Sequence, residues 1–149
     1  MIRRPWLTPA VRGYSRLGNY GLGWAVAGVA VGAAKGSPRV AVELPAVVGA
    51  AFGLNVLVKR IVRRTRPAAA GHLIVAPTSS SFPSSHAATA GAGAIAIGLD
   101  APALLPALVV AAVAMAATRV YLGVHHASDV IGGLALGALT GGAYVLVAR

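Results

Sequence analysis

The sequence predicts an all-α protein, a polytopic membrane helix bundle with about five transmembrane helices and an N-terminal interfacial segment. The chain has 149 residues, of which 57% are hydrophobic and only 11% charged, and its mean hydropathy is +0.76. A soluble domain would carry about a quarter charged residues. The apolar residues also fall in long blocks and not at amphipathic periods, which is typical of membrane-spanning segments.

Five apolar blocks correspond to the expected helices. They cover residues 19–34, 40–61, 84–99, 103–121 and 128–148. A Lys-Gly-Ser-Pro-Arg turn follows the first block, and Asp100-Ala101-Pro102 separates the third from the fourth. Residues 1–18 mix apolar side chains with four arginines, which predicts an interfacial amphipathic segment. The alternative for this N-terminus is a cleaved signal peptide, which the long stretch before the apolar run disfavours.

Small residues recur at four-residue spacing in two of the expected helices. The first helix has Gly28 and Gly32, and the last has Gly133, Gly137 and Gly141. Such stripes let helix backbones approach closely in lipid. We favour packing within one bundle, and the alternative is a homo-oligomer that forms through these faces.

Most of the remaining polar groups fall in three short motifs. These are Lys59-x6-Arg66-Pro67, Pro83-Ser84-Ser85-His86 and Thr118-Arg119-x5-His125-x3-Asp129. Alternating spans bring the end of the second helix, the start of the third, the end of the fourth and the start of the fifth to one membrane face. The topology therefore predicts that the three motifs meet. We expect a single domain, residues 1–149, with residues 59–85 as the active-site loop.

The first two motifs contain groups suited to bind an anion. Lys59 and Arg66 are seven residues apart and would share one face of a continuing helix, about 20° out of register, which Pro67 would end. Arginine presents a fork of donors that matches phosphate oxygens, and lysine adds a point charge. Ser84 would cap the next helix, whose positive end favours an anion. Asn55 would orient Lys59 or make a helix-to-helix hydrogen bond.

The third motif adds the reactive groups. Asp129, four residues after His125, can hold one ring nitrogen as a donor and leave the other free to attack. His86 comes from another helix and can protonate a departing oxygen. Two histidines ringed by cations describe phosphoryl transfer through a phosphohistidine. The alternative is a metal site in which His125 and Asp129 are joined by further histidines. These histidines would be His72, His86 and His126.

In this order the motifs resemble the type 2 phosphatidic acid phosphatase superfamily of membrane lipid phosphatases. The pattern of that family is Lys-x6-Arg-Pro, then Pro-Ser-Gly-His, then Ser-Arg-x5-His-x3-Asp, and the resemblance spans residues 59–129. It implies that His125 is the nucleophile, that Asp129 orients it and that His86 is the general acid. It also implies a phosphate site without metal or cofactor. The groups of this site would be Lys59, Arg66, Ser84, Arg119 and the backbone around Ser85.

Two positions depart from the family pattern. Ser85 stands where the family usually has Gly, and Thr118 stands where it usually has Ser. Both residues are small, so the resemblance still implies a phosphate cradle. The Ser85 side chain would restrict how closely a bulky substrate approaches.

The net charge of +10 points to phosphate headgroups. In a soluble protein it would suggest nucleic acid, but here the arginines flank apolar blocks, so membrane lipids are the expected partners and nucleic acid is not. Ten of the thirteen Lys and Arg residues fall on the motif face of the expected topology. The positive-inside rule then predicts an active site on the cytoplasmic face of a bacterial plasma membrane.

A cytoplasmic site suits a phosphorylated lipid intermediate made inside the cell. The resemblance extends to small actinobacterial members of the family, which remove the 5-phosphate from decaprenylphosphoryl-phosphoribose, a precursor of cell-wall arabinan. This is the expected substrate, and the alternatives are a polyprenyl diphosphate, phosphatidylglycerophosphate or phosphatidic acid. Two other classes remain as alternatives, an inactive lipid-binding membrane subunit and a small transporter. A transporter would place charges near the mid-membrane and not at helix ends.

Overall fold

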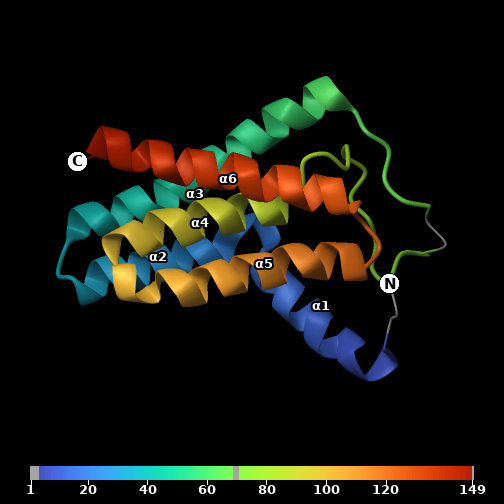
Figure 1. Ribbon diagram of the computed structural model, residues 1–149, viewed down its shortest axis with the longest axis horizontal. Coiled ribbons are helices and arrows are strands. Elements are labelled where there is room, and N and C mark those ends of the chain that lie inside the picture. Colours follow the sequence, from blue (N-terminus) through green and yellow to red (C-terminus); the bar gives the residue numbers. More distant parts are fainter. Residues whose placement is uncertain (1–3, 69–70, 149) are drawn as a thin grey trace.

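All elements in the part of the chain that the structure describes are helices, and five of them form a bundle (Figure 1). The computed structural model describes residues 4–68 and 71–148. The bundle helices are α2 (Leu22–Ala34), α3 (Pro38–Val62), α4 (Ser85–Asp100), α5 (Leu105–Tyr121) and α6 (Ala127–Ala148). Before them come η1 (Pro5–Leu7), α1 (Thr8–Leu17) and η2 (Asn19–Gly21), and η4 (Pro102–Leu104) leads into α5. The all-α prediction is confirmed.

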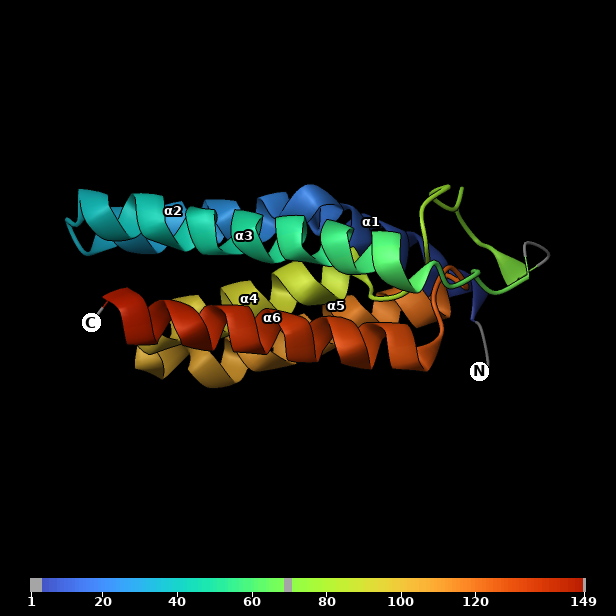
Figure 2. The same ribbon diagram turned by 90° about the horizontal axis from the view of Figure 1, so that it is seen from above.

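The bundle has two layers, with α2 and α3 in one and α4, α5 and α6 in the other (Figure 2). Helix α4 is central and packs against α3, α5 and α6. Eleven of its sixteen residues are buried, and nearly all of these are Ala or Gly. Small side chains let three neighbours approach one helix closely. Helix α1 lies obliquely across α5, where the Tyr14 hydroxyl donates to the Ala111 carbonyl at 2.8 Å.

The breaks between helices follow from local sequence. Gly36 takes the left-handed conformation, with φ of 61°, that ends α2. Helix α3 then starts with Pro38 in its first turn, and the Ser37 hydroxyl accepts a hydrogen bond from the Val40 amide at 3.3 Å. At the same end of the bundle, Lys35 pairs with Asp100 at 3.3 Å.

Three helical segments are long and apolar enough to cross a membrane by length and composition. They are Pro38–Val62, Pro102–Tyr121 and Ala127–Val147. Helices α2 and α4, with 13 and 16 residues, are shorter than the roughly 20 residues that a span needs. The protein is therefore an integral membrane protein, and three of the five expected helices have the length and composition of a full span among the described residues. The short helix α4 is enclosed by its neighbours and presents little surface to lipid.

Both glycine stripes are used inside the bundle. A Cβ atom at Gly32 would overlap the backbone of Ala41 on α3, and a Cβ atom at Gly137 would lie 2.7 Å from the Ala92 amide nitrogen on α4. Packing within one bundle therefore accounts for these stripes. A homo-oligomer would have to use other surfaces.

The end of α3 agrees with the expected block 40–61, but the helix does not continue to Pro67. The helix stops at Val62, and Arg63 takes a left-handed conformation with φ of 49°. Lys59 and Arg66 are therefore not on one continuing helical face, and Pro67 does not end the helix. The reversal at Arg63 turns the chain back across the end of the bundle, which allows the next arginines to reach α6.

Candidate active site

The three motifs meet at one end of the bundle, beneath the loop that joins α3 to α4 (Figure 1). A cavity of about 270 Å³ lies there. Its lining includes five of the predicted site residues, which are Arg66, Ser85, His86, Arg119 and His125. The convergence that alternating helices predict is thus present. Asp129, Lys59 and Ser84 do not line this cavity.

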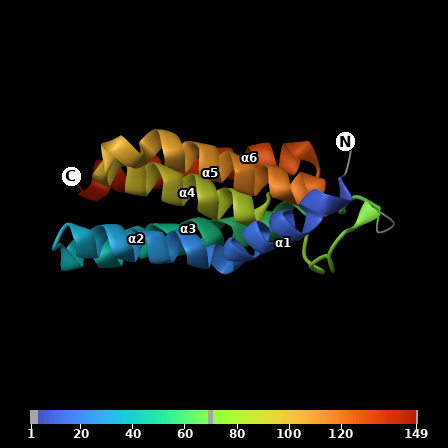
Figure 3. The ribbon, with the colours of Figure 1, turned by 90° about the horizontal axis from the view of Figure 1, so that it is seen from below.

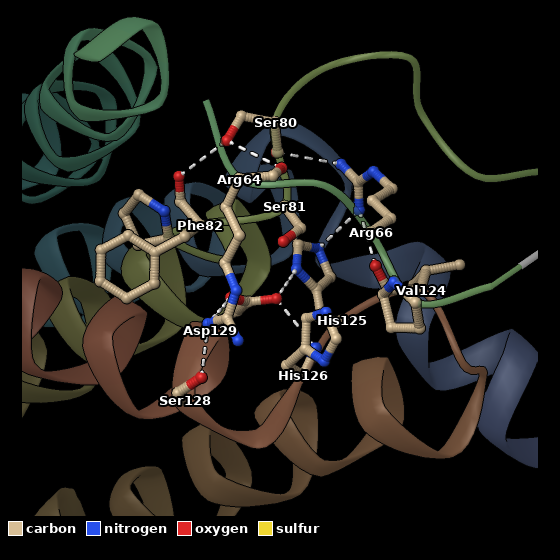
Figure 4. A network of polar contacts seen from close by, with 12 residues as sticks. Arg64, Arg66, Ser80, Ser81, Phe82, Val124, His125, His126, Ser128 and Asp129 are labelled. Carbon is tan, nitrogen blue, oxygen red and sulfur yellow. Dashed lines mark hydrogen bonds and ion pairs between the residues drawn. The ribbon is translucent and has the colours of Figure 1, made fainter. Parts of the chain in front are cut away.

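His125 and Asp129 form a buried pair at the start of α6 (Figure 4). The Nδ1 atom of His125 lies 3.4 Å from Oδ2 of Asp129. His125 precedes the helix and Asp129 lies in its first turn. The same Oδ2 atom accepts the backbone N–H of His126 at 2.8 Å, which caps the helix and fixes the carboxylate. Arg64 donates to Oδ1 at 3.0 Å.

Arg66 defines the other side of the His125 ring (Figure 4). Its Nη1 atom lies 3.1 Å from Nε2 of His125 and donates to the Val124 carbonyl at 2.8 Å. A guanidinium has only donors, so Nε2 must be the accepting nitrogen. The proton of a neutral ring then sits on Nδ1 and faces Asp129. This tautomer leaves the Nε2 lone pair directed at the cationic side of the site.

Burial keeps His125 neutral. Removal from solvent lowers the pKa of its imidazole from 6.5 to about 2, and the positive charges of Arg66, Arg119 and Lys59 act in the same direction. Burial also lowers the pKa of Arg66, which remains a cation. The site therefore joins an uncharged, nucleophilic imidazole to fixed positive charge, as attack on a phosphorus atom requires.

His86 and Arg119 enter the cavity from α4 and α5. The Nε2 atom of His86 lies 3.2 Å from Oδ1 of Asn19. Arg119 donates through Nη1 to the Ser15 hydroxyl, and its buried Nε has no hydrogen-bond partner among the described residues. Arg119 thus lines the cavity and keeps one buried donor without an acceptor among the described residues.

Two of the predicted phosphate-binding side chains, Lys59 and Ser85, are engaged by other groups of the protein, whereas the Ser84 hydroxyl is not. Lys59 donates to the Ser80 carbonyl at 2.5 Å and lines a neighbouring groove of about 720 Å³, together with Arg66. Ser84 precedes α4, but its hydroxyl makes no capping hydrogen bond, so the predicted side-chain cap is wrong. This hydroxyl is buried and has no hydrogen-bond partner within residues 4–68 and 71–148. Its amide instead donates to the Asp129 carbonyl at 2.9 Å. Ser85 donates to Oδ1 of Asn55 at 2.7 Å.

Asn55 does not orient Lys59. Its amide donates to the Pro83 carbonyl at 3.1 Å, and its oxygen accepts from Ser85. Asn55 therefore ties α3 to the start of α4, which is the helix-to-helix role that the sequence also allowed. The Ser85 hydroxyl, absent from the usual family pattern, is the group that this contact engages.

Three supporting residues were not predicted. Arg64 contacts Asp129, Asn19 contacts His86, and Ser15 contacts Arg119. In the sequence, Arg64 is one of several arginines between Arg60 and Arg66, and nothing in the spacing distinguishes it from the others. Asn19 and Ser15 lie 67 and 104 residues from their partners, and no local spacing links them.

The alternative metal site has no support in the described geometry. No group of three or more His, Asp or Glu side chains gathers among the residues that the structure describes. His72 lies with Nε2 3.0 Å from the Pro67 carbonyl. Neither His72 nor His126 lines the 270 Å³ cavity.

The fold and this arrangement define a membrane-embedded phosphatase. Residues 40–149 match the model of the PAP2 superfamily, and the chain belongs to that superfamily. It is 39% identical to a decaprenylphosphoryl-5-phosphoribose phosphatase of Mycobacterium tuberculosis, over 95% of this chain and 80% of that protein. It is 37% identical to the protein of the same name from Mycolicibacterium smegmatis, over 87% and 73% of the two chains.

A solved structure has the same architecture. The crystal structure of a transmembrane PAP2-type phosphatidylglycerolphosphate phosphatase from Bacillus subtilis matches with a TM-score of 0.82 and 30% identity. The match covers 99% of this chain and 79% of that one. The resemblance drawn from the three motifs is therefore confirmed, as is the class of enzyme.

Proposed function

We propose that this protein removes the terminal 5-phosphate from a polyprenylphosphoryl-5-phosphoribose, with decaprenylphosphoryl-5-phosphoribose as the leading substrate. The observation that carries the chemistry is the neutral His125 ring held between Asp129 and Arg66. The relatives that share 37–39% identity over most of the chain support the choice of lipid.

In the proposed mechanism, Nε2 of His125 attacks the phosphorus atom of the terminal phosphate. A nitrogen–phosphorus bond forms as the bond from phosphorus to the sugar oxygen breaks, and His86 supplies the proton that this oxygen takes up. Asp129 stabilises the positive ring through Nδ1. Water, deprotonated by His86, then attacks the phosphohistidine, and inorganic phosphate and free His125 result.

Arg66, Arg119 and Lys59 would bind the three non-reacting oxygens, where most of the stabilisation of a phosphoryl-transfer transition state arises. Arg66 contacts the attacking nitrogen directly, and the buried Nε of Arg119 has no acceptor among the described residues. In this proposal Lys59 exchanges the Ser80 carbonyl for a phosphate oxygen. Ser84, whose buried hydroxyl has no partner in the described part of the chain, and the backbone at Ser85 complete the cradle.

A second candidate substrate is phosphatidylglycerophosphate, which the whole-chain likeness to the Bacillus subtilis enzyme favours. We expect purified protein in detergent with EDTA to release phosphate from decaprenylphosphoryl-5-phosphoribose with a kcat/KM at least about tenfold above that for phosphatidylglycerophosphate or a polyprenyl diphosphate. EDTA is expected to have little effect, because the cations of the site are side chains. If the protein prefers one of the other two lipids, that lipid becomes the proposed substrate in place of decaprenylphosphoryl-5-phosphoribose. Full loss in EDTA that zinc restores would favour the metal alternative.

We further propose that the active site faces the cytoplasm. Nine of the eleven Lys and Arg residues in the described ranges lie at the loop end of the bundle (Figure 1). Arg3, expected on the same face, and Arg149, expected on the opposite face, lie outside the described residues. An excess of positive charge favours the cytoplasmic side, and the active-site cations alone do not account for it.

This orientation predicts a labelling pattern. The chain contains no cysteine, so Gly71→Cys in the loop and Ala103→Cys at the opposite end each create a single thiol. In spheroplasts we expect a membrane-impermeant maleimide to label Cys at position 103 and to spare position 71 until the membrane is permeabilised. The reverse pattern would place the active site outside the cell.

A further inference from the structure

Two arginines of α1 line a second chamber beside the active site. This chamber of about 700 Å³ is bounded by Arg12 and Arg16 on α1 and by the loop that carries Leu73 and Ile74. The Arg12 side chain donates one hydrogen bond to the Leu73 carbonyl. The exposed side chain of Arg16 makes no hydrogen bond or ion pair with any described residue. Helix α1 crosses the loop end of the bundle (Figure 3), and it precedes the residues that match the superfamily model.

The chamber adjoins the active-site cavity on the His86 side. His86, Arg119 and Asn19 line both spaces, whereas His125 lines only the smaller one. The 720 Å³ groove on the other side contains Arg60 and Arg63 but neither active-site histidine. The chamber therefore reaches His86, whereas the 720 Å³ groove reaches neither histidine.

The proposed mechanism fixes which space receives the leaving group. In an in-line displacement, the departing oxygen lies opposite the attacking atom. His125 provides that atom, and His86 protonates the departing oxygen. The rest of the substrate, attached to this oxygen, must then extend past His86 into the chamber lined by α1.

We propose that Arg12 and Arg16 form a second anion subsite, which binds a phosphodiester in the leaving group. An arginine fork matches two phosphodiester oxygens, and Leu73 with Ile74 offers an apolar wall for the first part of the lipid chain. The chemical class of substrate is a lipid joined by a phosphodiester to a phosphorylated sugar. This subsite rests on the proposed function. It gives helix α1, which contains none of the three motifs, a role in selecting the substrate.

The test compares two short-chain substrates in detergent. Farnesylphosphoryl-5-phosphoribose carries both phosphates, and farnesyl monophosphate carries only the one to be removed. We expect Arg16→Gln to raise KM for the first substrate about tenfold, the effect of losing a hydrogen bond between charged groups, with kcat nearly unchanged. KM for farnesyl monophosphate should stay within about twofold. Arg16→Lys should give an intermediate KM, because the charge remains without the fork.

Arg63→Gln, in the other groove, is the matched control and should leave both KM values within about twofold of the parent. An equal rise for both substrates in Arg16→Gln would mean that α1 only contacts the membrane surface, and would overturn the subsite. A rise confined to Arg63→Gln would move the leaving group to the other groove and would overturn it as well. If the parent protein releases phosphate from neither substrate, the proposed function fails, and the subsite fails with it.

Discussion

His125→Ala is expected to lower phosphate release by at least about a thousandfold, because the variant keeps the cations that bind phosphate but has no atom to receive it. The parent protein, mixed with substrate labelled in the terminal phosphate and quenched in alkali, should retain label that acid removes, as a phosphohistidine does. The variant should retain none. The measurement is label bound to protein together with phosphate released.

His126→Ala is the matched control. It removes an adjacent imidazole that does not line the cavity, and it keeps the backbone N–H that Asp129 accepts. Label and turnover should stay within a few-fold of the parent. Turnover near normal in His125→Ala would exclude the covalent mechanism, and equal loss in both variants would point to a disturbed helix start and not to a missing nucleophile.

The sequence predicts the fold through its breaks and its apolar blocks. A turn at Gly36 and a break after Asp100 separate helices because glycine and proline act locally. The expected block 40–61 matches the end of α3, but the continuation of the helix to Pro67 is wrong. The run from Arg60 to Arg66 contains no residue whose type stops a helix, so the sequence does not show the reversal at Arg63. Arg63 takes its left-handed conformation in the folded protein, where the chain that follows contacts α6.

The sequence predicts the site residues that lie in motifs at helix ends. It does not predict which of several neighbouring arginines contacts Asp129. His125, His86, Arg66 and Arg119 meet because four helix ends share one end of the bundle. Arg64 contacts Asp129 only because the reversal at the preceding residue directs it there. Such long-range selection depends on the fold and not on spacing.

Gly137→Ala is expected to destabilise the bundle by about 2 kcal/mol or more, as overpacking of a dense interface does. The added methyl group would lie 2.7 Å from the Ala92 amide nitrogen and closer still to the Ala88 carbonyl oxygen. Both are helix backbone atoms of α4, which cannot rotate away as a side chain would. The thermal midpoint in detergent, followed by the fluorescence of buried Trp24, should therefore fall by several degrees.

Gly142→Ala on the same helix should have the opposite sign. No atom lies within 4 Å of the Cβ atom it would add, so the loss of backbone freedom in the unfolded chain should stabilise the protein by about 0.4–1 kcal/mol. Equal midpoints for the two variants would mean that α4 and α6 do not pack at this distance. Activity should also fall in Gly137→Ala and persist in Gly142→Ala, because the packing of α4 on α6 sets the helix that carries His86 beside the helix that carries Asp129.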